Sequence, residues 1–325
     1  LARSLGRNAQ KVGSQVSNRI SVSAPGKINI FFKVGALQEN GFHEVLSVYQ
    51  ALDLRETVTV TPADNWQVSV SGALSADQIA AVPTGEENLV VRAAKSIAEL
   101  AGLEDPHPVN FEITKSVPVA GGMGGGSADA AAALLAVDEL WCTGVDGEAL
   151  LKKAAELGAD IPFALLGGTA IGVGKGDELE PVNGVQELHW VLVPMDAGLS
   201  TPRVYAKLDE IRKSRGDNPK TVPTPISPIQ LLHALKFGDA HEVAKYLHND
   251  LQEAAVALMP ELSETMDAGL AAGALAAIVS GSGPTVAMLA ESEEAAESIA
   301  NQLSFQGYVA IPTVGPAKGT LMESQ

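Results

Sequence analysis

Cysteine, aromatic residues and positive charge are scarce in this chain of 325 residues. The single cysteine, Cys142, cannot form an internal disulfide, which favours a reducing compartment such as the cytoplasm. There are 22 Lys and Arg against 39 Asp and Glu, so the chain lacks the basic surface that nucleic-acid binding requires. No run approaches the roughly 20 apolar residues of a membrane span. We therefore expect a small-molecule partner, no nucleic acid and no membrane, and a monomer or weak homodimer.

Acidic residues are absent before Glu39, whereas Arg3, Arg7, Lys11 and Arg19 lie among serines and asparagines. This composition predicts a basic, flexible extension over residues 1–18. It also fits an organelle transit peptide, which would direct the protein to a plastid. The segment has no apolar core of the kind that secretion signals carry. Composition alone does not decide between an extension and a transit peptide.

The apolar pattern of the remaining chain predicts an α+β fold with two lobes, residues 19–184 and residues 185–325. Alternating apolar residues predict strands over residues 20–22, 28–32, 58–60, 66–70, 109–113 and 190–193, a strand–turn–strand over 274–289, and a last strand over 308–311. Helical spacing predicts helices over residues 89–101, 128–140, 147–157 and 293–303. Four prolines between Lys213 and Pro228 predict a mobile loop.

The strongest local signal is the glycine-rich run from Gly121 to Ser127, between a predicted strand and a predicted helix. Glycines let the backbone approach an anion, and the helix N-terminus adds positive dipole. The Walker A pattern does not match, because no lysine precedes Ser127. The dinucleotide-binding pattern does not match either, because Ser127 stands where that pattern has its last glycine. A linker or a packing turn is the alternative, but neither fits a position between a clear strand and a strong helix. The run therefore predicts a phosphate-binding loop.

Two further turns accompany this run: Ala24-Pro25-Gly26-Lys27-Ile28-Asn29 in the first strand region, and Ser280-Gly281-Ser282-Gly283-Pro284-Thr285 between two apolar strands. Each alone reads as an ordinary turn. The three segments in this order resemble the motifs of the kinase superfamily named for galactokinase, homoserine kinase, mevalonate kinase and phosphomevalonate kinase (GHMP). The resemblance implies a nucleotide lobe like ribosomal protein S5, a ferredoxin-like C-terminal lobe and an active site between them.

Four segments narrow the resemblance to one branch of the superfamily. They are the long double-glycine loop at residues 118–129, Gly41-Phe42-His43, the acidic motif at residues 157–163 and Asn249-Asp250-Leu251. The branch they resemble phosphorylates, with ATP, the 2-hydroxyl of a diphosphocytidyl-linked methylerythritol in non-mevalonate isoprenoid synthesis. The alternatives are another small-alcohol kinase of the superfamily, such as homoserine kinase, and a non-catalytic ligand sensor on the same fold.

The resemblance implies ATP and Mg²⁺ as cofactors and gives roles to matching residues. Asp160 would receive the proton of the alcohol, and Lys27 beside it would orient the carboxylate and offset charge on the transferred phosphoryl group. Without the resemblance, Asp160 reads as a helix cap and Lys27 as a solvated lysine. The positions that match ATP-binding residues are Asn88, Lys115, Pro118, Val119, Ala120, Gly121, Gly122, Met123, Gly124, Gly125, Gly126, Ser127 and Ala128.

Substrate contacts also follow from the resemblance. His43 would meet the cytosine edge, Phe42 and Tyr205 would stack on the two faces of the base, and Asn29 would help to fix the diphosphate-alcohol end. Ser282 would face the substrate or the phosphates. Phe42 stands where the branch usually has tyrosine, so one hydroxyl is lost. No magnesium ligand is identified, although Ser127 and Asp160 are candidates, and the six histidines show no zinc spacing.

Overall fold

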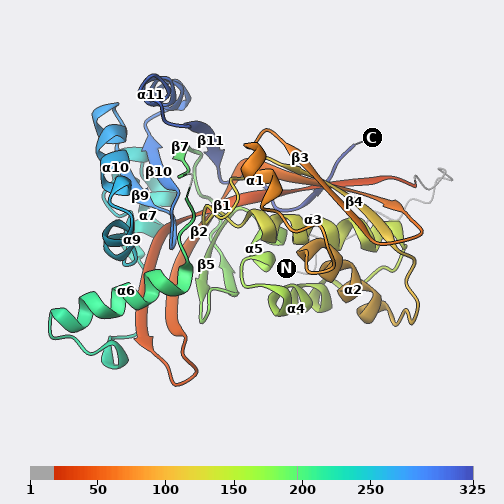
Figure 1. The fold of residues 1–325 in the computed structure, drawn as a ribbon. Helices are drawn as coiled ribbons and strands as arrows, with labels where there is room; N and C mark the ends of the chain where they lie inside the picture. Colours follow the sequence, from red (N-terminus) through yellow and green to blue (C-terminus); the bar gives the residue numbers. More distant parts are fainter. Residues whose placement is uncertain (1–17, 196, 325) are drawn as a thin grey trace.

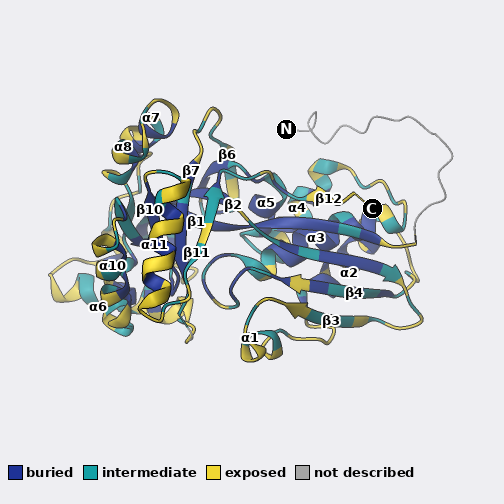
Figure 2. Cartoon of the chain, turned by 90° about the horizontal axis from the view of Figure 1, so that it is seen from above, coloured by how far each residue is buried: buried dark blue, intermediate teal, exposed yellow. Residues whose placement is uncertain are grey.

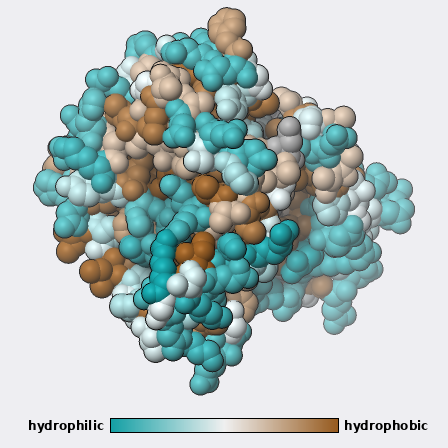
Figure 3. Space-filling model, turned by 60° about the vertical axis from the view of Figure 1, so that its left-hand side comes forward, coloured by the Kyte–Doolittle hydropathy of each residue, from teal (hydrophilic) through white to brown (hydrophobic). Residues whose placement is uncertain are grey.

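The computed structural model describes residues 18–195 and 197–324, so residues 1–17 of the predicted extension lie outside the described residues. Strands and helices alternate through both halves of the chain, as the sequence predicted (Figure 1). Within the described ranges, none of the helices is long and apolar enough to span a membrane. On the face that Figure 3 shows, hydrophobic residues lie in small groups between hydrophilic ones.

The larger sheet is built on two long antiparallel strands, β1 (Ile20–Leu37) and β2 (His43–Pro62). Its other strands are β3 (Gln67–Gly72), β4 (Val109–Lys115), β5 (Thr169–Val173) and β6 (Glu178–Pro181). Two short strands from the second half of the chain, β8 (His248–Asn249) and β12 (Leu321–Met322), also pair with β1. The C-terminal part of the chain therefore returns to the first sheet.

The helices of the first half pack on this sheet around an alanine-rich core (Figure 1). Asn88 caps α2 through a hydrogen bond to the Val90 N–H, and Gly102 ends the helix in the left-handed conformation, as the sequence predicted. The helices are α1 (Ala76–Ala80), α2 (Leu89–Ala101), α3 (Gly125–Leu140), α4 (Gly147–Leu157) and α5 (Ile161–Leu166). α3 contacts both β1 and β2, and Gly124 at its N-terminus lies against Lys27 of β1.

The second sheet is antiparallel, in the order β11-β7-β10-β9. Its strands are β7 (Leu188–Val193), β9 (Ala276–Val279), β10 (Val286–Ala290) and β11 (Ile311–Gly315). The chain enters it after Pro181, where β6 ends. The helical segments of this half are α6 (Thr201–Ser214), the 3₁₀ helix η1 (Pro219–Thr221), α7 (Ile229–Phe237), α8 (Ala240–Ala244), α9 (Gln252–Leu258), α10 (Glu261–Ala271) and α11 (Glu293–Phe305).

The predicted last strand at residues 308–311 is misplaced, because β11 begins only at Ile311. The N–H of Tyr308 donates to the Leu303 carbonyl, and Gly307 has a φ angle of 93°. These contacts close the C-terminal end of α11 and use residues 307 and 308 to do so. The outer face of α11 is exposed, in contrast to the buried strands beneath it (Figure 2).

β1 contributes to three separate cores along its length. Val22 and Ala24 pack under α2 and α3, Ile28 and Ile30 pack with β7 and α7, and Phe32 lies in the core of the second sheet. Figure 2 shows β1 buried along most of its course. Lys27 and Asn29, two of the predicted site residues, lie in the middle of this strand.

Candidate active site

The glycine-rich run forms a turn that leads directly into α3. Gly122 and Gly124 have φ angles of 75° and 71°, a conformation that residues with a Cβ rarely adopt. No side chain caps α3, and in the described part of the chain the N–H groups of residues 125–127 have no acceptor. Unpaired N–H groups at the positive end of a 16-residue helix are suited to bind an anion such as phosphate.

Lys27 and Asp160 meet beside this turn, as the resemblance implied. The Lys27 ammonium lies 3.7 Å from Oδ2 of Asp160, and it donates to Oδ1 of Asn29 at 2.8 Å. A Cβ built on Gly124 would lie 3.3 Å from Cγ of Lys27 and 3.9 Å from Oδ2 of Asp160. The Lys27 N–H donates to the Met123 carbonyl, which fixes the strand against the turn. The glycine turn, the lysine and the carboxylate therefore occupy one place.

The environments of the two charged groups differ. The Lys27 side chain is 10% exposed, whereas that of Asp160 is 33% exposed. Both line a cavity of about 210 Å³. Asp160 is the residue that precedes α5, but its side chain makes no capping hydrogen bond, so the cap interpretation of the sequence does not hold. The carboxylate is left free to interact with a bound molecule.

The third glycine turn lies against the first two. The Asn29 N–H donates to Oγ of Ser280 at 3.3 Å, and a Cβ on Gly281 would approach Oδ1 of Asn29 within 2.8 Å. A Cβ on Gly122 would approach the Gly283 carbonyl within 2.7 Å. These short separations leave no room for side chains at the two glycines. The structure therefore brings together the three turns that the sequence singled out.

A second cavity, of about 480 Å³, adjoins the first and has mostly apolar walls. Here Nε2 of His43 lies 3.0 Å from Oδ1 of Asp209, and the ring of Tyr205 stacks on that of His43 at a centroid distance of 5.1 Å. Phe42 is 57% exposed at the rim, with the Lys175 ammonium 4.8 Å from the centre of its ring. Burial, and then the charge of Asp160, raise the pKa of Tyr205, so its hydroxyl stays protonated.

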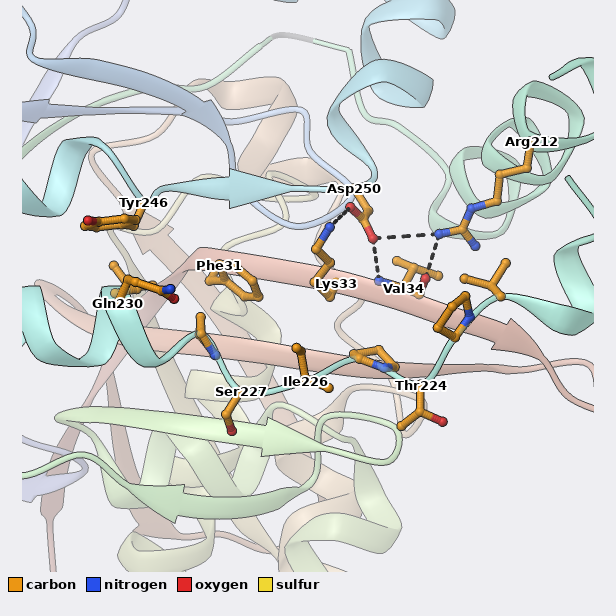
Figure 4. Close-up of a pocket in the computed structure, with 15 residues that line it drawn as sticks. Phe31, Lys33, Val34, Arg212, Thr224, Ile226, Ser227, Gln230, Tyr246 and Asp250 are labelled. Atoms are coloured by element: carbon orange, nitrogen blue, oxygen red, sulfur yellow. Dashed lines mark hydrogen bonds and ion pairs between the residues drawn. The ribbon is translucent and has the colours of Figure 1, made fainter.

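Tyr205 and Asp209 lie on one face of α6, and Arg212 continues that face at helical spacing. Arg212 donates to the Val34 carbonyl at 2.6 Å and lies 3.7 Å from Asp250 (Figure 4). Asp250 also accepts from Lys33 and from the Val34 N–H. Burial raises the pKa of Asp250, but the hydrogen bonds from His248 and the Val34 N–H and the charge of Lys33 outweigh it and lower that pKa. Three successive turns of α6 are thus anchored to β1 and β2.

A buried charge cluster lies beneath the glycine turn. The Lys115 ammonium lies 2.5 Å from Oε1 of Glu56 and 2.8 Å from Oδ2 of Asp129. A Cβ on Gly125 would lie 2.9 Å from Oε1 of Glu56, so the cluster forms the floor of the turn. Burial and the charge of Asp129 raise the pKa of Glu56 to about 7, although Lys115 and the Ser116 N–H act in the opposite direction. Burial also raises the pKa of Asp129.

Two residues matched to ATP binding have other partners in the structure. The Lys115 side chain is only 2% exposed and is held by the two carboxylates. The Asn88 side chain accepts from the Val90 N–H and donates to the Pro83 carbonyl, and the residue is buried. The Asn88 side chain thus binds backbone groups, and the Lys115 side chain links β2 to α3 through the two carboxylates. A contact between either residue and a nucleotide remains a prediction.

The structure also adds residues that sequence reasoning did not select. The cavities are lined by Tyr49, Lys175 and Thr201 in addition to the predicted residues. The hydroxyl of Thr201 lies 2.9 Å from that of Ser282, which joins α6 to the third turn. Thr201 and Asp209, four residues before and after Tyr205 in a helical segment, are additions that periodicity could have revealed.

Comparison of the chain with known proteins shows the family to which it belongs. Family models match the chain over residues 88–168, as the N-terminal domain of GHMP kinases, and over residues 231–309, as their C-terminal domain. A relative from Arthrobacter sp. (strain FB24), named 4-diphosphocytidyl-2-C-methyl-D-erythritol kinase, is 48% identical over 94% of this chain and 96% of its own length. The chain belongs to the GHMP kinase family. The resemblance inferred from the three glycine turns is thereby confirmed.

Other comparisons of this GHMP kinase agree. A relative of the same name from Leifsonia xyli subsp. xyli (strain CTCB07) is 47% identical over 92% of this chain and 97% of its own length. The crystal structure of a 4-(cytidine 5'-diphospho)-2C-methyl-D-erythritol kinase is 30% identical, with a TM-score of 0.72 over 92% of this chain and all of that chain. The mevalonate kinase of L. major, at 17% identity and a TM-score of 0.73 over 95% of this chain and all of that chain, shares the fold.

Proposed function

We propose that this GHMP kinase transfers the γ-phosphoryl group of ATP to the 2-hydroxyl of 4-diphosphocytidyl-2-C-methyl-D-erythritol, in the synthesis of isoprenoid precursors. Its relatives carry the name of this kinase and match the chain over nearly its whole length. One observation in the structure carries the proposal: Lys27, Asp160 and the uncapped end of α3 meet at a single cavity.

Each part of the proposed reaction has a matching group. The N–H groups at the start of α3 bind the phosphates, and the small size of Gly122 and Gly124 keeps the turn open to them. Asp160 accepts the proton of the 2-hydroxyl. The oxygen of that hydroxyl bonds to the γ-phosphorus while the bond between the γ-phosphorus and the departing ADP breaks. Lys27, held by Asn29, orients the carboxylate and offsets negative charge in the transition state.

The second cavity suits the other end of this substrate. Its apolar walls, the stacked rings of His43 and Tyr205 and the exposed ring of Phe42 offer flat surfaces for a pyrimidine base. Asp209 interacts with Nε2 of His43 and so fixes the orientation of the imidazole ring, including its second nitrogen, Nδ1. The base is therefore expected in this cavity, with the alcohol in the first.

Magnesium ions would accompany the ATP. In the described residues, no group of three or more His, Cys, Asp or Glu side chains forms a metal cluster. This fits Mg²⁺ in kinases, which is held by one or two carboxylates together with substrate phosphates and water. Asp160, whose side chain makes no capping hydrogen bond to α5, and Ser127 would supply oxygen ligands of the required kind. The ion would neutralise charge on the phosphates.

The test is ADP release by the purified protein with ATP, Mg²⁺ and the cytidylated alcohol. Homoserine and mevalonate serve as alternative acceptors, and the Asp160→Asn variant as the control for background hydrolysis. The proposal expects release only with the cytidylated alcohol and only with Asp160 present. Release that depends on homoserine instead would assign the chain to another GHMP activity, and an absence of substrate-dependent release would reject the kinase assignment.

A further inference from the structure

Asn249, in β8, has a buried side chain that makes three hydrogen bonds. Its Nδ2 donates to the carbonyls of Val279 and Gly281, at 2.7 Å in each case. Its Oδ1 accepts from the Leu251 N–H at 2.9 Å. A carboxamide has two N–H donors, so both are used here. The Asn249 side chain therefore connects the residue before α9 to the end of β9 and to the third glycine turn.

The end of β9 needs these bonds because β9 is an edge strand of the second sheet. The backbone groups on the outer side of an edge strand have no partner strand. At Val279, Oε1 of Gln252 accepts from the N–H at 3.0 Å, and Asn249 donates to the carbonyl. Two amide side chains thus take the place of a neighbouring strand. Gln252 bonds to the strand, whereas Asn249 extends this support to Gly281 in the turn.

Gly281 packs against two residues of the first cavity, Asn29 and Lys27. A Cβ built on Gly281 would lie 2.8 Å from Oδ1 of Asn29 and 3.9 Å from Nζ of Lys27. The same Oδ1 accepts from the Lys27 ammonium, and the Asn29 N–H donates to Oγ of Ser280. The third turn is therefore a wall against which Asn29 and Lys27 rest, and Asn249 fixes the position of this wall.

We propose that Asn249 is a positioning residue for phosphoryl transfer, which acts by holding the third glycine turn against Asn29 and Lys27. This role rests on the proposed function, in which Lys27 and Asp160 act on the transferred group. Without the N–H donors of Asn249, the Gly281 carbonyl loses its hydrogen bond in a buried place, and the turn shifts to regain one. A displacement of about 1 Å at reacting groups can lower a rate about 10²-fold.

The test compares Asn249→Ser with Gln252→Ala. Serine keeps an oxygen that can accept from the Leu251 N–H but is too short to reach Gly281. Gln252→Ala removes a bond to β9 and leaves the bonds of Asn249 in place. We expect Asn249→Ser to lower kcat about 10- to 100-fold, while the KM for ATP changes less than about threefold. Gln252→Ala should lower Tm to a similar extent and keep kcat within about twofold. An unchanged kcat in Asn249→Ser, or equal losses of kcat in the two variants, would overturn this role.

Amide hydrogen exchange without substrate measures the turn directly. Exchange over residues 280–285 should be several-fold faster in Asn249→Ser than in the wild type, and close to the wild-type rate in Gln252→Ala. Unchanged exchange in Asn249→Ser would contradict the proposal. If that variant does not fold, Asn249→Asp, which keeps the shape of the side chain but has no N–H donor, takes its place with the same expectations. Failure of the proposed function is distinct, because the wild-type protein would then not turn over the cytidylated alcohol, while the exchange comparison still tests the turn.

Discussion

The Lys27 ammonium lies 3.7 Å from the Asp160 carboxylate, and the backbone of Gly124 packs against both side chains. Lys27 lies in β1, Asp160 directly precedes α5, and Gly124 directly precedes α3. Because none of these elements is adjacent to another in sequence, their meeting point depends on the whole first lobe. The pair is the part of the site with the clearest chemical consequence.

Replacing Asp160 by asparagine should remove the proton acceptor and keep the shape of the side chain. We expect kcat to fall by about 10²–10⁴-fold, the range for losing a general base, with little change in the KM for ATP. Steady-state ADP release measures both constants, and thermal unfolding confirms that the variant is folded. A variant that keeps full kcat would exclude Asp160 as the base.

Gly124→Ala and Gly102→Ala form a matched pair for testing the glycine turn. Both glycines have left-handed φ angles, 71° and 67°, so each alanine should cost about 1–2 kcal/mol of stability. A Cβ on Gly102 meets nothing within 4 Å, whereas one on Gly124 would press on Lys27. We expect similar losses of Tm in both variants but a loss of kcat/KM only in Gly124→Ala. Equal activity losses would show that the effect is one of stability.

Asp209→Ala should loosen His43 without touching the glycine turn. The carboxylate holds Nε2 of His43 at 3.0 Å, so its loss leaves the ring free to rotate. We expect the KM for the cytidylated alcohol to rise about fivefold, equivalent to about 1 kcal/mol, at constant KM for ATP. Glu210→Ala, at the next position, removes an exposed carboxylate that pairs only with Lys207 in the described residues, and should have no effect.

The buried cluster beneath the turn should make stability depend on pH. The pKa of Glu56 rises from 4.5 to about 7 on folding, so between these pH values the folded state holds more protons than the unfolded state. The free energy of unfolding should therefore fall as the pH rises from about 4.5 to about 7. The raised pKa of Asp129 acts in the same direction. Denaturant titrations at pH 5 and pH 8 measure the difference.

Two variants separate the members of this cluster. Glu56→Gln leaves one lysine with one carboxylate, so the pH dependence should flatten and stability at pH 8 should be kept. Lys115→Met leaves two buried carboxylates without a cation and should cost about 3–5 kcal/mol. If both variants lose the same stability at pH 8, the cluster does not carry the excess negative charge that its geometry indicates.

Much of the site could be predicted because its residues lie in short glycine-containing segments. Gly121–Ser127 is recognisable locally, Lys27 and Ser280–Thr285 are recognisable only in combination with it, and the structure brings the three together. β1 and β2 were predicted only in pieces. In β1, Pro25 and Gly26 interrupt the alternation between residues 20–22 and 28–32, so this part of the strand reads as a turn. A shift of register between Pro25 and Lys27 accommodates them within the strand.

Contacts between residues that are far apart in the sequence could not be predicted. Lys175 lies in a turn whose sequence carries no motif, and its position between the two cavities of the site depends on the pairing of β5 with β2. Glu56 lies within a long strand, and its partners Lys115 and Asp129 come from β4 and α3. A charged residue in such positions reads as solvated until the packing is known.

The continuity of β1 through three cores has a mechanical consequence. Any bending of one lobe against the other must deform the β1–β2 ribbon. Two of its three register shifts, between Pro25 and Lys27 and between Asn29 and Phe31, flank residues 27–29, and at these places the pairing is already interrupted. Lys27 and Asn29 therefore sit on the part of the ribbon that yields first. Opening and closing of the molecule would be transmitted to the catalytic lysine by the backbone that carries it, without any intermediary.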